Sequence, residues 1–410
     1  MLAVVAPLGA NAGDSVIRVG NEAQFAAAVS ALREHGGTIV LRRHVYRGEL
    51  VVGARSRHPL RIVGGPGVRV QSLVLDHTQR VSVGPLTIAP VTDDAWIKVY
   101  HSRHVELHDL LVTAERTRLR ATVDIPDSSH VVIRRSEFRH CGDRSPLFSN
   151  CLHLQAHARH VLVSESWFHD CRGCDFVHGR FGYDLTLRDN RLERTLPCRM
   201  HDRFRCGHQD LVELFSGQGL LVEGNSFGVY RQGGAQLYLF GRIDHVSIVN
   251  NVFRGTDPRV PGYRARIALI IGSRHARRVP QRVAVVNNTI LTGGRRIDGY
   301  AGSIRMSGVY WSLSPKKRPL LANNVIGLLE DPHHVCSVAR AAISNVVLRG
   351  TACRGFNVVG DAHLDPSGRP TARSTLLIDR ATPGYAPRLD LVGHLRGRWP
   401  DIGAFEYRGS

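Results

Sequence analysis

A pattern of two short apolar segments separated by turn residues recurs along most of this chain and constrains its fold more than any other feature. In the copy at residues 208–227, the apolar run 211–214 is followed by the turn residues 216–219, and the run 220–222 is followed by a second turn. Each run is too short for a helix and is bounded by turn formers, so each predicts a β-strand. Copies follow one another at about 24 to 37 residues, which is typical of solenoid repeats.

The first strand type of this repeat occurs eight times. Its copies are AWIKVY (95–100), ATVDIP (121–126), CLHLQ (151–155), DFVHG (175–179), DLVELF (210–215), AQLYLF (235–240), IALIIG (267–272) and SIRMSG (303–308). A second strand type follows each copy, and its later copies end in Asn and an apolar residue, as in the NNVF of residues 250–253.

A single repeat has too little apolar surface for a core of its own, so the repeats are predicted to stack and bury alternate side chains in one column. Asparagines fall at matching positions after the second strand, where stacked amides can hydrogen-bond from coil to coil. These positions are Asn190, Asn225, Asn251, Asn288 and Asn324. The phenylalanines repeated at 138, 168, 227 and 253 are predicted to be core residues.

The two ends of the chain depart from the repeat. Residues 14–46 contain a helical segment with Asn21 as its N-cap, which Gly36 and Gly37 end, and this helix is predicted to cover the open end of the stack. Residues 330–410 are rich in Pro, Gly and Arg and predict irregular C-terminal coils. We therefore expect one domain over residues 14–410, preceded at 1–13 by the remnant of a signal peptide.

The formal net charge of +19 favours an acidic partner. The basic residues are scattered, so nucleic acid is not expected, and no apolar run is long enough for a membrane helix. Such a charge fits nucleic acid, an anionic membrane surface or an acidic polysaccharide, and we expect the polysaccharide, although a well-solvated basic surface also fits. The apolar N-terminus and eight cysteines predict a secreted, disulfide-bonded protein of unspecified oligomeric state. Short-range pairs such as Cys198 with Cys206 or Cys336 with Cys353 fit that prediction, and zinc bound by Cys171, Cys174, Cys198 and Cys206 is the alternative.

The sequence resembles secreted right-handed parallel β-helix proteins of the pectate-lyase-like superfamily. The resemblance is carried by the Asn-containing strand ends, the turn at His208-Gln209-Asp210 and the C-terminal DIGAFEY at 401–407, and it covers roughly residues 38–407. It implies an all-β fold, a right-handed parallel β-helix with a short N-terminal capping helix. It implies no particular reaction, because this fold carries lyases, hydrolases, epimerases and binding modules.

Alternate residues of a strand point outward, so the first strand type predicts a column of exposed side chains along the stack. Its expected members are Lys98, Asp124, His153, Val177, Glu213, Tyr238, Ile270 and Arg305. A second outward column is expected to hold Tyr100, Gln155, Phe215 and Phe240. Such a column brings acids, imidazoles and aromatic rings together, as a sugar site requires, although a solvated polar face is the alternative.

The candidate residues divide into two groups. The catalytic candidates are His153, Asp175, His178, His208, Asp210, Glu213 and Tyr238. The candidates for substrate binding are Asp124, Gln155, Arg180, Tyr183, Arg203, Arg205, Phe215, Arg231, Gln236 and Arg305. Arginine suits bidentate binding of carboxylates, and aromatic rings offer stacking faces to sugars.

Two reactions fit these residue types, and a non-catalytic glycan-binding protein is the third alternative. A lyase or C5-epimerase would use arginines to neutralise a uronate carboxylate and His153, His178, His208 or Tyr238 as the base. A glycoside hydrolase or fructan transglycosylase would use two carboxylates, Glu213 with Asp210 or Asp175. No cofactor is expected, except that calcium would fit carboxylates placed beside an anionic sugar.

Overall fold

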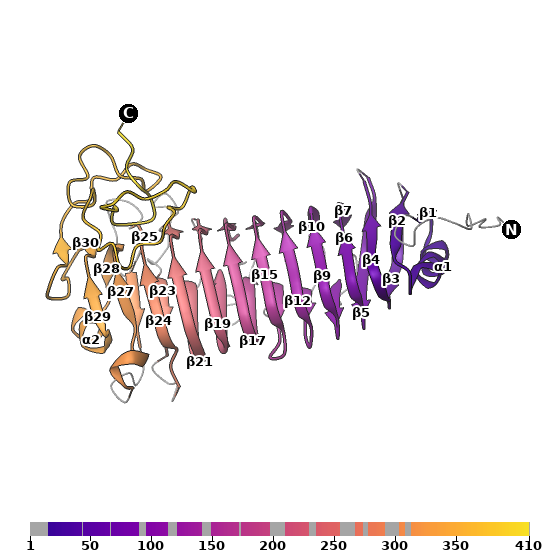
Figure 1. Cartoon of the computed structure of the whole chain (residues 1–410), viewed down its shortest axis with the longest axis horizontal. Coiled ribbons are helices and arrows are strands. Elements are labelled where there is room, and N and C mark those ends of the chain that lie inside the picture. The colour runs from indigo at the N-terminus through magenta and orange to yellow at the C-terminus, as the bar shows by residue number, and fades with distance from the viewer. Residues whose placement is uncertain are drawn as a thin grey trace.

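The structure is a computed structural model of the 410-residue chain. It describes residues 15–42, 44–65, 67–89, 96–113, 121–141, 149–171, 174–196, 210–228, 235–254, 267–273, 278–291, 303–307 and 313–409. Strands from successive coils lie side by side along a rod, with the N-terminal helix at one end and an irregular C-terminal segment at the other (Figure 1). All pairings between the named strands are parallel, which confirms the predicted parallel β-helix.

The strands form three stacks that run along the rod, and each coil contributes to all three. Stack 1 carries the first strand type. It consists of β3 (Val45–Val52), β5 (Arg69–Asp76), β8 (Ile97–Tyr100), β11 (Ala121–Ile125), β14 (Ser149–Leu154), the first half of β17 (Cys174–Arg188), the first half of β19 (Val212–Glu223), the first half of β21 (Ala235–Val249), β23 (Ile267–Ile271), β26 (Ser303–Met306) and the end of β28 (Val325–Leu329).

Stack 2 carries the second strand type and includes the second halves of β17, β19 and β21. Its other members are β1 (Val16–Val19), β2 (Gly37–Leu41), β4 (Arg55–Val63), β6 (Gln79–Val83), β9 (Arg103–His108), β12 (Ser129–Arg134), β15 (Arg159–Ser164), β24 (Gln281–Val286), β27 (Leu320–Ala322) and β29 (Ala341–Ile343).

Stack 3 is built from the shortest strands and also takes in the first residues of β3, β5 and β28. Its other members are β7 (Leu86–Ile88), β10 (Leu110–Thr113), β13 (Glu137–Arg139), β16 (Trp167–His169), β18 (Arg191–Glu193), β20 (Ser226–Phe227), β22 (Val252–Phe253), β25 (Thr289–Ile290), β30 (Val346–Arg349) and β31 (Val358–Val359).

The core is one continuous column of inward-facing side chains, as the repeat predicted. Phe138 stacks on Phe168 with ring centroids 4.7 Å apart, and Phe227 stacks on Phe253 at 4.5 Å. All four rings are fully buried. In each pair, a ring packs against the ring at the equivalent position of the next coil. The core is therefore continuous from one coil to the next at both places.

The predicted asparagine ladder lies at the corner between stack 2 and stack 3. Asn190, Asn225, Asn251, Asn288 and Asn324 are joined from coil to coil by side-chain hydrogen bonds of 2.9 to 3.1 Å. Each Oδ1 also accepts the backbone N–H of the preceding rung, as Asn251 does from Asn225 at 2.9 Å. The ladder continues through Asn345 and Asn357, two rungs that the repeat alignment did not include.

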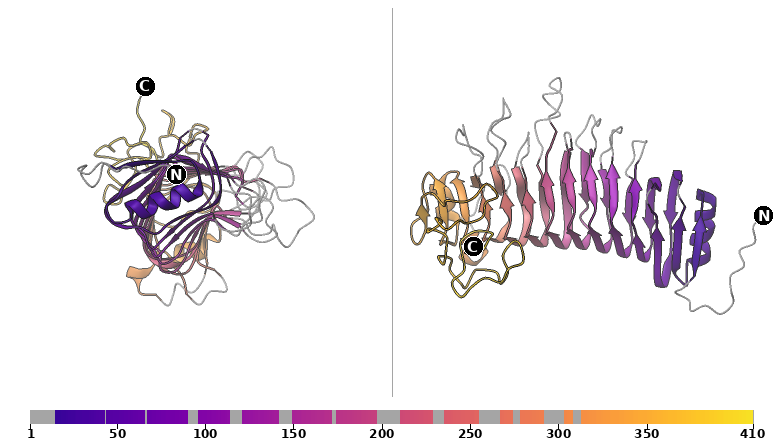
Figure 2. Two further views of the ribbon diagram at one scale, coloured as in Figure 1. Left: turned by 90° about the vertical axis from the view of Figure 1, so that its right-hand side faces the viewer. Right: turned by 90° about the horizontal axis from the view of Figure 1, so that it is seen from above.

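The N-terminal cap matches the prediction. Helix α1 (Glu22–Leu32) begins at Asn21, whose side chain accepts the backbone N–H of Gln24 at 2.9 Å. Viewed along the rod, α1 lies across the open end of the coils (Figure 2). Its buried face consists of Phe25, Ala28, Val29 and Leu32.

The C-terminal part is irregular over most of its length, and the prediction missed one helix in it. Helix α2 (Pro332–Val338) begins at Asp331, which caps the backbone N–H of His334 and has φ at 52°. A short 3₁₀ turn, η1 (Pro315–Lys317), precedes it. Pro332 sits in the first turn of α2, where proline is compatible with a helix, so the Pro-rich composition did not exclude one.

Three disulfides lie within the described residues, and they pair Cys141 with Cys151, Cys171 with Cys174 and Cys336 with Cys353. The last of these confirms a predicted pair. The second joins two of the four cysteines of the zinc alternative to each other, and the other two, Cys198 and Cys206, lie outside the described residues. Disulfides are typical of proteins that fold outside the cytosol. Among the described residues, no helix combines the length and the apolar character that crossing a membrane requires.

Candidate functional site

An outward row of side chains follows stack 1, and we call it the rung column. Strand register places its members one coil apart in the order Lys98, Asp124, His153, His178, Glu213, Tyr238, Ile270 and Arg305. Asp124, His153 and Glu213 therefore share one face of the solenoid, as predicted. Val177 was wrongly assigned to this column, because it is in register with the buried Leu152 and points into the core.

Asp124 organises the first part of the rung column. Its Oδ1 accepts hydrogen bonds from Nδ1 of His153 and Nε2 of Gln155, both at 3.0 Å. Its Oδ2 accepts Nε2 of Gln155 at 3.1 Å and the hydroxyl of Tyr100 at 3.4 Å. A carboxylate that holds Nδ1–H fixes the tautomer of the imidazole, so Nε2 of His153 is left as a proton acceptor.

His178 occupies the next rung and is held differently from His153. The two rings are stacked with centroids 5.8 Å apart, and Nε2 of His178 lies 3.4 Å from Oε2 of Glu213. The ring also meets the edge of Phe215 at 5.3 Å. Within the described residues, Nδ1 of His178 is buried and has no hydrogen-bond partner. Neither nitrogen of His178 is therefore presented to solvent as that of His153 is.

A second row of carboxyl groups lies beneath the rungs, at the start of the strands. Asp175 and Asp210 are 4% and 0% exposed, which removes these two catalytic candidates from direct contact with a substrate. Oδ1 of Asp175 accepts the backbone N–H of Asp210 at 2.8 Å, and Oδ1 of Asp210 accepts that of Ala235. Both carboxyl groups thus tie one coil to the next.

The surroundings of Asp175 favour its neutral form. Burial raises its pKa well above the usual range, and the nearby charges of Asp210 and Glu213 act in the same direction. A side-chain hydrogen bond joins Asp175 to Glu213, the carboxyl group that also faces His178. Asp175 thus supports the column from below.

Aromatic rings flank the rungs on the side of Glu213. Phe215 stacks on Phe240 at 5.3 Å, and Tyr238 lies 4.8 Å from Phe240. The guanidinium of Arg180 lies 4.9 Å above the ring of Phe215. Burial raises the pKa of Tyr238, and the charges of Asp210 and Glu213 add to this effect, while a hydrogen bond with Ser273 opposes it. Tyr238 therefore stays protonated near neutral pH.

Arg180 belongs to the coil after that of His153. It follows Gly179, which is in register with Leu154. Its guanidinium lies over the ring of Phe215, on the following coil. Arg180 is exposed, and no ion pair with a described residue engages it. It is therefore a cation beside the rung column that is available to a substrate anion.

Several predicted substrate-binding residues lie elsewhere. Gln236 is 2% exposed and donates to three backbone carbonyls, including that of Gly228 at 2.9 Å, so it is a structural residue and the prediction for it was wrong. Tyr183 lies on stack 2, where it contacts His160 and Arg159. Arg305 ends the rung column in an ion pair with Glu330. The predictions for His208, Arg203, Arg205 and Arg231 fall outside the described residues.

Sequence reasoning assigned no role to two polar neighbours of the site. Tyr100 was placed in an outward column, but its hydrogen bond to Asp124 was not foreseen, since that contact joins two different columns. Ser273, which bonds Tyr238, follows β23 directly and belongs to no repeated position. The hydrogen bond between Tyr100 and Asp124 could have been indicated only by register, since Asp124 is paired with Lys98 and Tyr100 lies two residues after Lys98.

One group of residues in the site has the spacing of metal ligands. Ligand atoms of Asp175, His178 and Glu213 all lie within 4.8 Å of one another. The set contains one imidazole and two carboxyl groups that already share a proton, whereas calcium prefers six to eight oxygen ligands. The residues therefore fit the expected calcium poorly, and we derive no step through a metal.

Three solved structures illustrate what the chain is similar to. A PL6 family polysaccharide lyase from Pseudopedobacter saltans has 14% identity and a TM-score of 0.45, over 87% of this chain and 96% of its own. An alginate lyase from Paenibacillus sp. str. FPU-7 has 13% identity and a TM-score of 0.37, over 58% of this chain and 94% of its own. The catalytic domain of a GH87 alpha-1,3-glucanase in complex with nigerose has 10% identity and a TM-score of 0.36, over 87% and 67%.

These similarities concern the fold alone. The sequence matches no protein-family model and no curated protein. The fold implied by the resemblance to the pectate-lyase-like superfamily is confirmed by the strand pairing, and the chain is a parallel β-helix protein.

Proposed function

We propose that the protein removes the C5 proton of a uronate in an acidic polysaccharide, as a lyase or a C5-epimerase. The observation that carries this proposal is the pair formed by His153 and Asp124, in which the carboxylate holds Nδ1 at 3.0 Å and leaves Nε2 as a base. An imidazole oriented by a carboxylate is the arrangement that general-base catalysis uses.

Arg180 would supply the second requirement of this reaction. Removing a proton next to a carboxylate builds negative charge on that carboxylate, so a cation beside it lowers the barrier. Arg180 is exposed on the coil next to that of His153, and its guanidinium lies over the ring of Phe215. A uronate with C5 above His153 would draw this guanidinium to its acid group.

The lyase step is balanced as follows. The C5–H bond breaks as Nε2 of His153 takes the proton, a double bond forms between C4 and C5, and the bond from C4 to the glycosidic oxygen breaks. The imidazolium is then the nearest described acid that can protonate the leaving oxygen. In the epimerase, C5 would instead take a proton from water on the opposite face, and the imidazolium would release its own proton to solvent. Tyr238 does not take part at this position, because three coils separate it from His153, or about 14 Å.

The experiment is incubation of the protein with alginate, pectate, glucuronan and glycosaminoglycans in D₂O. Deuterium at C5 by NMR reports epimerisation, and ultraviolet absorbance of an unsaturated uronate reports elimination, whose product carries no hydrogen at C5. We expect His153→Ala to lower the rate by about 10² or more, and Arg180→Ala to lower kcat/KM by a similar factor. The absence of both signals with every polymer would overturn the proposal.

Matched controls exist on stack 2 for both variants. His160 is also an exposed imidazole paired with an aspartate, Asp184, at 2.9 Å. Arg159 lies over the ring of Tyr183 at 5.2 Å, as Arg180 lies over Phe215. His160→Ala and Arg159→Ala should leave the rate unchanged. Equal losses in both pairs of variants would assign the effect to stability rather than to the site.

Hydrolysis is the second candidate, and the place of Glu213 on the rung column, with a hydrogen bond to the buried Asp175, favours it. Its weakness is geometry, since the other carboxylate of the rung column, Asp124, lies three coils from Glu213, about 14 Å away. A two-carboxylate mechanism requires about 5 to 9.5 Å. New reducing ends without ultraviolet absorbance, lost in Glu213→Gln, would establish hydrolysis; binding without product would indicate a glycan-binding protein.

A further inference from the structure

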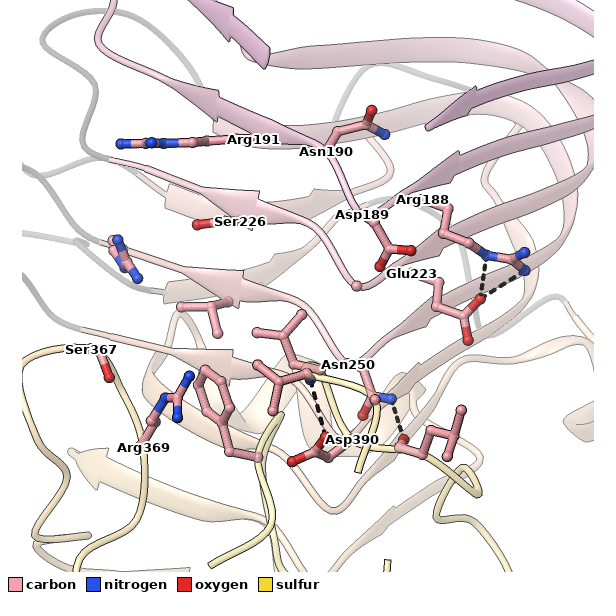
Figure 3. Close-up of a pocket in the computed structure, with 18 residues that line it drawn as sticks. Arg188, Asp189, Asn190, Arg191, Glu223, Ser226, Asn250, Ser367, Arg369 and Asp390 are labelled. Atoms are coloured by element: carbon pink, nitrogen blue, oxygen red, sulfur yellow. Dashed lines mark hydrogen bonds and ion pairs between the residues drawn. The ribbon is translucent and has the colours of Figure 1, made fainter. Parts of the chain in front are cut away.

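A second polar cavity lies away from the rung column, where the C-terminal segment meets the solenoid. It encloses about 870 Å³, within the range of small-ligand sites. One wall is the corner between stack 2 and stack 3, and the other is formed by residues 367–369, 389–393 and Phe405 (Figure 3). No rung of stack 1 lines it, so this groove is separate from the proposed catalytic site.

The position of the groove follows from the corner residues. Asp189, Gly224 and Asn250 occupy the same left-handed corner on three successive coils, with φ of 54°, 68° and 54°. Asn250, Asn287 and Asn323 hold the C-terminal segment by donating to backbone carbonyls, as Asn250 does to Leu389 at 2.7 Å. The C-terminal segment is thus bonded to the corner residues of three coils, the first of which carries Asn250. The groove lies over the corners of the two preceding coils, at Gly224 and Asp189.

Gly224 lines the groove, and the lack of a side chain there leaves room for the carboxylate of Asp189. A Cβ at this position would lie 2.2 Å from Oδ1 of Asp189, and the positive φ also disfavours other residues. The carboxylate of Asp189 has no hydrogen bond or ion pair with any described residue. It is therefore an acceptor that faces the groove.

One end of the groove is cationic. Arg191, Ser226, Ser367 and Arg369 lie along this end (Figure 3), and Arg254 follows Val252, which is in register with Ser226. Arg191 is paired with Glu193 at 2.6 Å. Arg254 and Arg369 have no carboxylate partner within the described part of the chain, and Arg369 lies 5.0 Å above the ring of Phe405.

The other end is polar but not cationic. Arg188 and Glu223 cancel one another in an ion pair of 2.9 Å. Asp189, Asn250 and Asp390 also lie at this end (Figure 3). Asp390 is buried, its Oδ1 accepts the backbone N–H groups of Val392 and His394 at 3.0 and 2.8 Å, and its Oδ2 accepts that of Glu406 at 3.1 Å. The exposed carboxylate of Asp189 is therefore the acceptor that suits a ligand donating hydrogen bonds.

We infer that the groove binds an anionic saccharide, with its acid group at Arg254 and Arg369 and its hydroxyl groups toward Asp189. A sugar acid offers both an anion and several hydroxyl donors, which matches the two ends. A nucleic-acid strand carries phosphates at every step and would bring one against Asp189. The inference does not depend on the proposed reaction, since binding here involves no rung residue.

The test is calorimetric titration of the full chain with uronate oligosaccharides, with sulfated oligosaccharides and with neutral oligosaccharides of equal length. The double variant His153→Ala/Arg180→Ala serves as the background, which disables the rung column and its turnover. We expect the acidic oligosaccharides to bind and the neutral ones not to bind. Arg254→Ala and Arg369→Ala should each weaken binding by about tenfold or more, because each removes a charged hydrogen-bond donor.

The matched control is Arg398→Ala, an arginine in the same segment that lies over Trp399 at 5.6 Å and does not line the groove. Ser226→Phe, which fills the groove from the solenoid side, keeps the test decisive if Arg254→Ala fails to fold. Binding that survives both Arg369→Ala and Ser226→Phe would overturn the inference, as would equal binding of neutral sugars or preference for single-stranded DNA. The absence of any C5 proton removal would sink the proposed function and leave this result unaffected.

Discussion

At the scale of single residues, the hydrogen bonds of the buried Asp175 have a clear consequence for the column above it. Its Oδ1 accepts the backbone N–H of Asp210, and a side-chain hydrogen bond joins it to Glu213. Glu213 in turn faces His178 at 3.4 Å. A neutral donor at position 175 is therefore sufficient to keep Glu213 in place, and an ionised one would repel it.

Replacing Asp175 with asparagine should be tolerated. Asparagine keeps the acceptor for the N–H of Asp210 and a donor for Glu213, so we expect a thermal midpoint within a few degrees of the original protein and an unchanged rate of C5 proton removal. Asp175→Ala leaves buried partners unsatisfied and should cost about 1 to 3 kcal/mol of unfolding free energy. Abolished turnover in a folded Asp175→Asn protein would instead make Asp175 a proton donor in the reaction.

At this scale the sequence could predict the rung column but not all of its members. Alternation placed Asp124, His153 and Glu213 correctly, whereas Val177 was chosen where His178 belongs. The cause is that Asp175, Phe176 and Val177 are all buried, which breaks alternation, and a shift of one residue exchanges the faces of a strand. Aligning Asp175 with Asp210, which are hydrogen-bonded on neighbouring coils, would have put His178 beside Glu213.

At the scale of elements, the asparagine ladder depends on side chains that each make several hydrogen bonds. Asn251 donates to two backbone carbonyls and to Asn288, and its oxygen accepts two donors from Asn225. All five bonds are between buried or partly buried groups. On earlier coils a serine occupies the same corner, as Ser166 does one coil before Asn190. The corner therefore does not require an asparagine on every coil.

Asn251→Ala should therefore lower the unfolding free energy by about 3 kcal/mol or more, because it leaves several buried hydrogen-bonding groups without partners. Chemical denaturation measures the loss. Asn357→Ala removes the last rung, which is only partly buried and has no further asparagine beyond it, and should cost less. Equal costs at the two positions would show that the ladder does not act through burial.

The C-terminal segment contains a carboxyl group that responds to pH. Burial raises the pKa of Asp401 to about 6, although the backbone N–H groups of Asp379 and Tyr407 donate to it and oppose the shift. The folded chain therefore holds this proton more tightly than the unfolded chain. Its contribution to stability is complete below about pH 4 and is lost as the pH rises through 6.

We expect the unfolding free energy of the original protein to fall by about 1 to 2 kcal/mol between pH 4 and 7 relative to Asp401→Asn, after allowance for solvent screening. Denaturant midpoints over this pH range give the comparison. Asp361→Asn, a change at an exposed carboxylate of the same segment, should keep the original pH dependence. Parallel curves for the original protein and Asp401→Asn would contradict the assignment.

The elements differ in how far local sequence determines them. Helix α1 was predictable because its cap, its apolar spacing and its terminating glycines all lie within 17 residues, from 21 to 37. Helix α2 was not, since it has seven residues and depends on Asp331 in a left-handed conformation. The docking of residues 377–405 on the corner asparagines also escaped prediction, because those contacts join positions more than 50 residues apart.

In the whole molecule, the N-terminal end of the solenoid is the place where molecules would associate if it were left uncovered. Stacked coils have no natural end, and an uncovered last coil exposes both strand edges and apolar side chains. Phe25 and Val29 bury the face of α1 that covers this end, while Ala23 and Ala27 face solvent.

Phe25→Asp/Val29→Asp should detach α1 and cause end-to-end association, which light scattering after size exclusion detects as a mass above that of the unmodified protein. Ala23→Asp/Ala27→Asp adds the same charges to the exposed face and should leave the mass unchanged. A detached α1 with no change in mass would mean that the first coil protects itself.

The rungs that meet at Asp124 and His153 are 29 residues apart along the chain, while the next contacts in the same stack span 35 and 25 residues. Their separation in space is nevertheless set by backbone pairing and does not depend on the length of the connecting turn. Evolution can thus lengthen or shorten a turn on any coil without misaligning the reactive side chains. A scaffold of this kind allows specificity to diverge between descendants while the spacing of its chemistry is inherited intact.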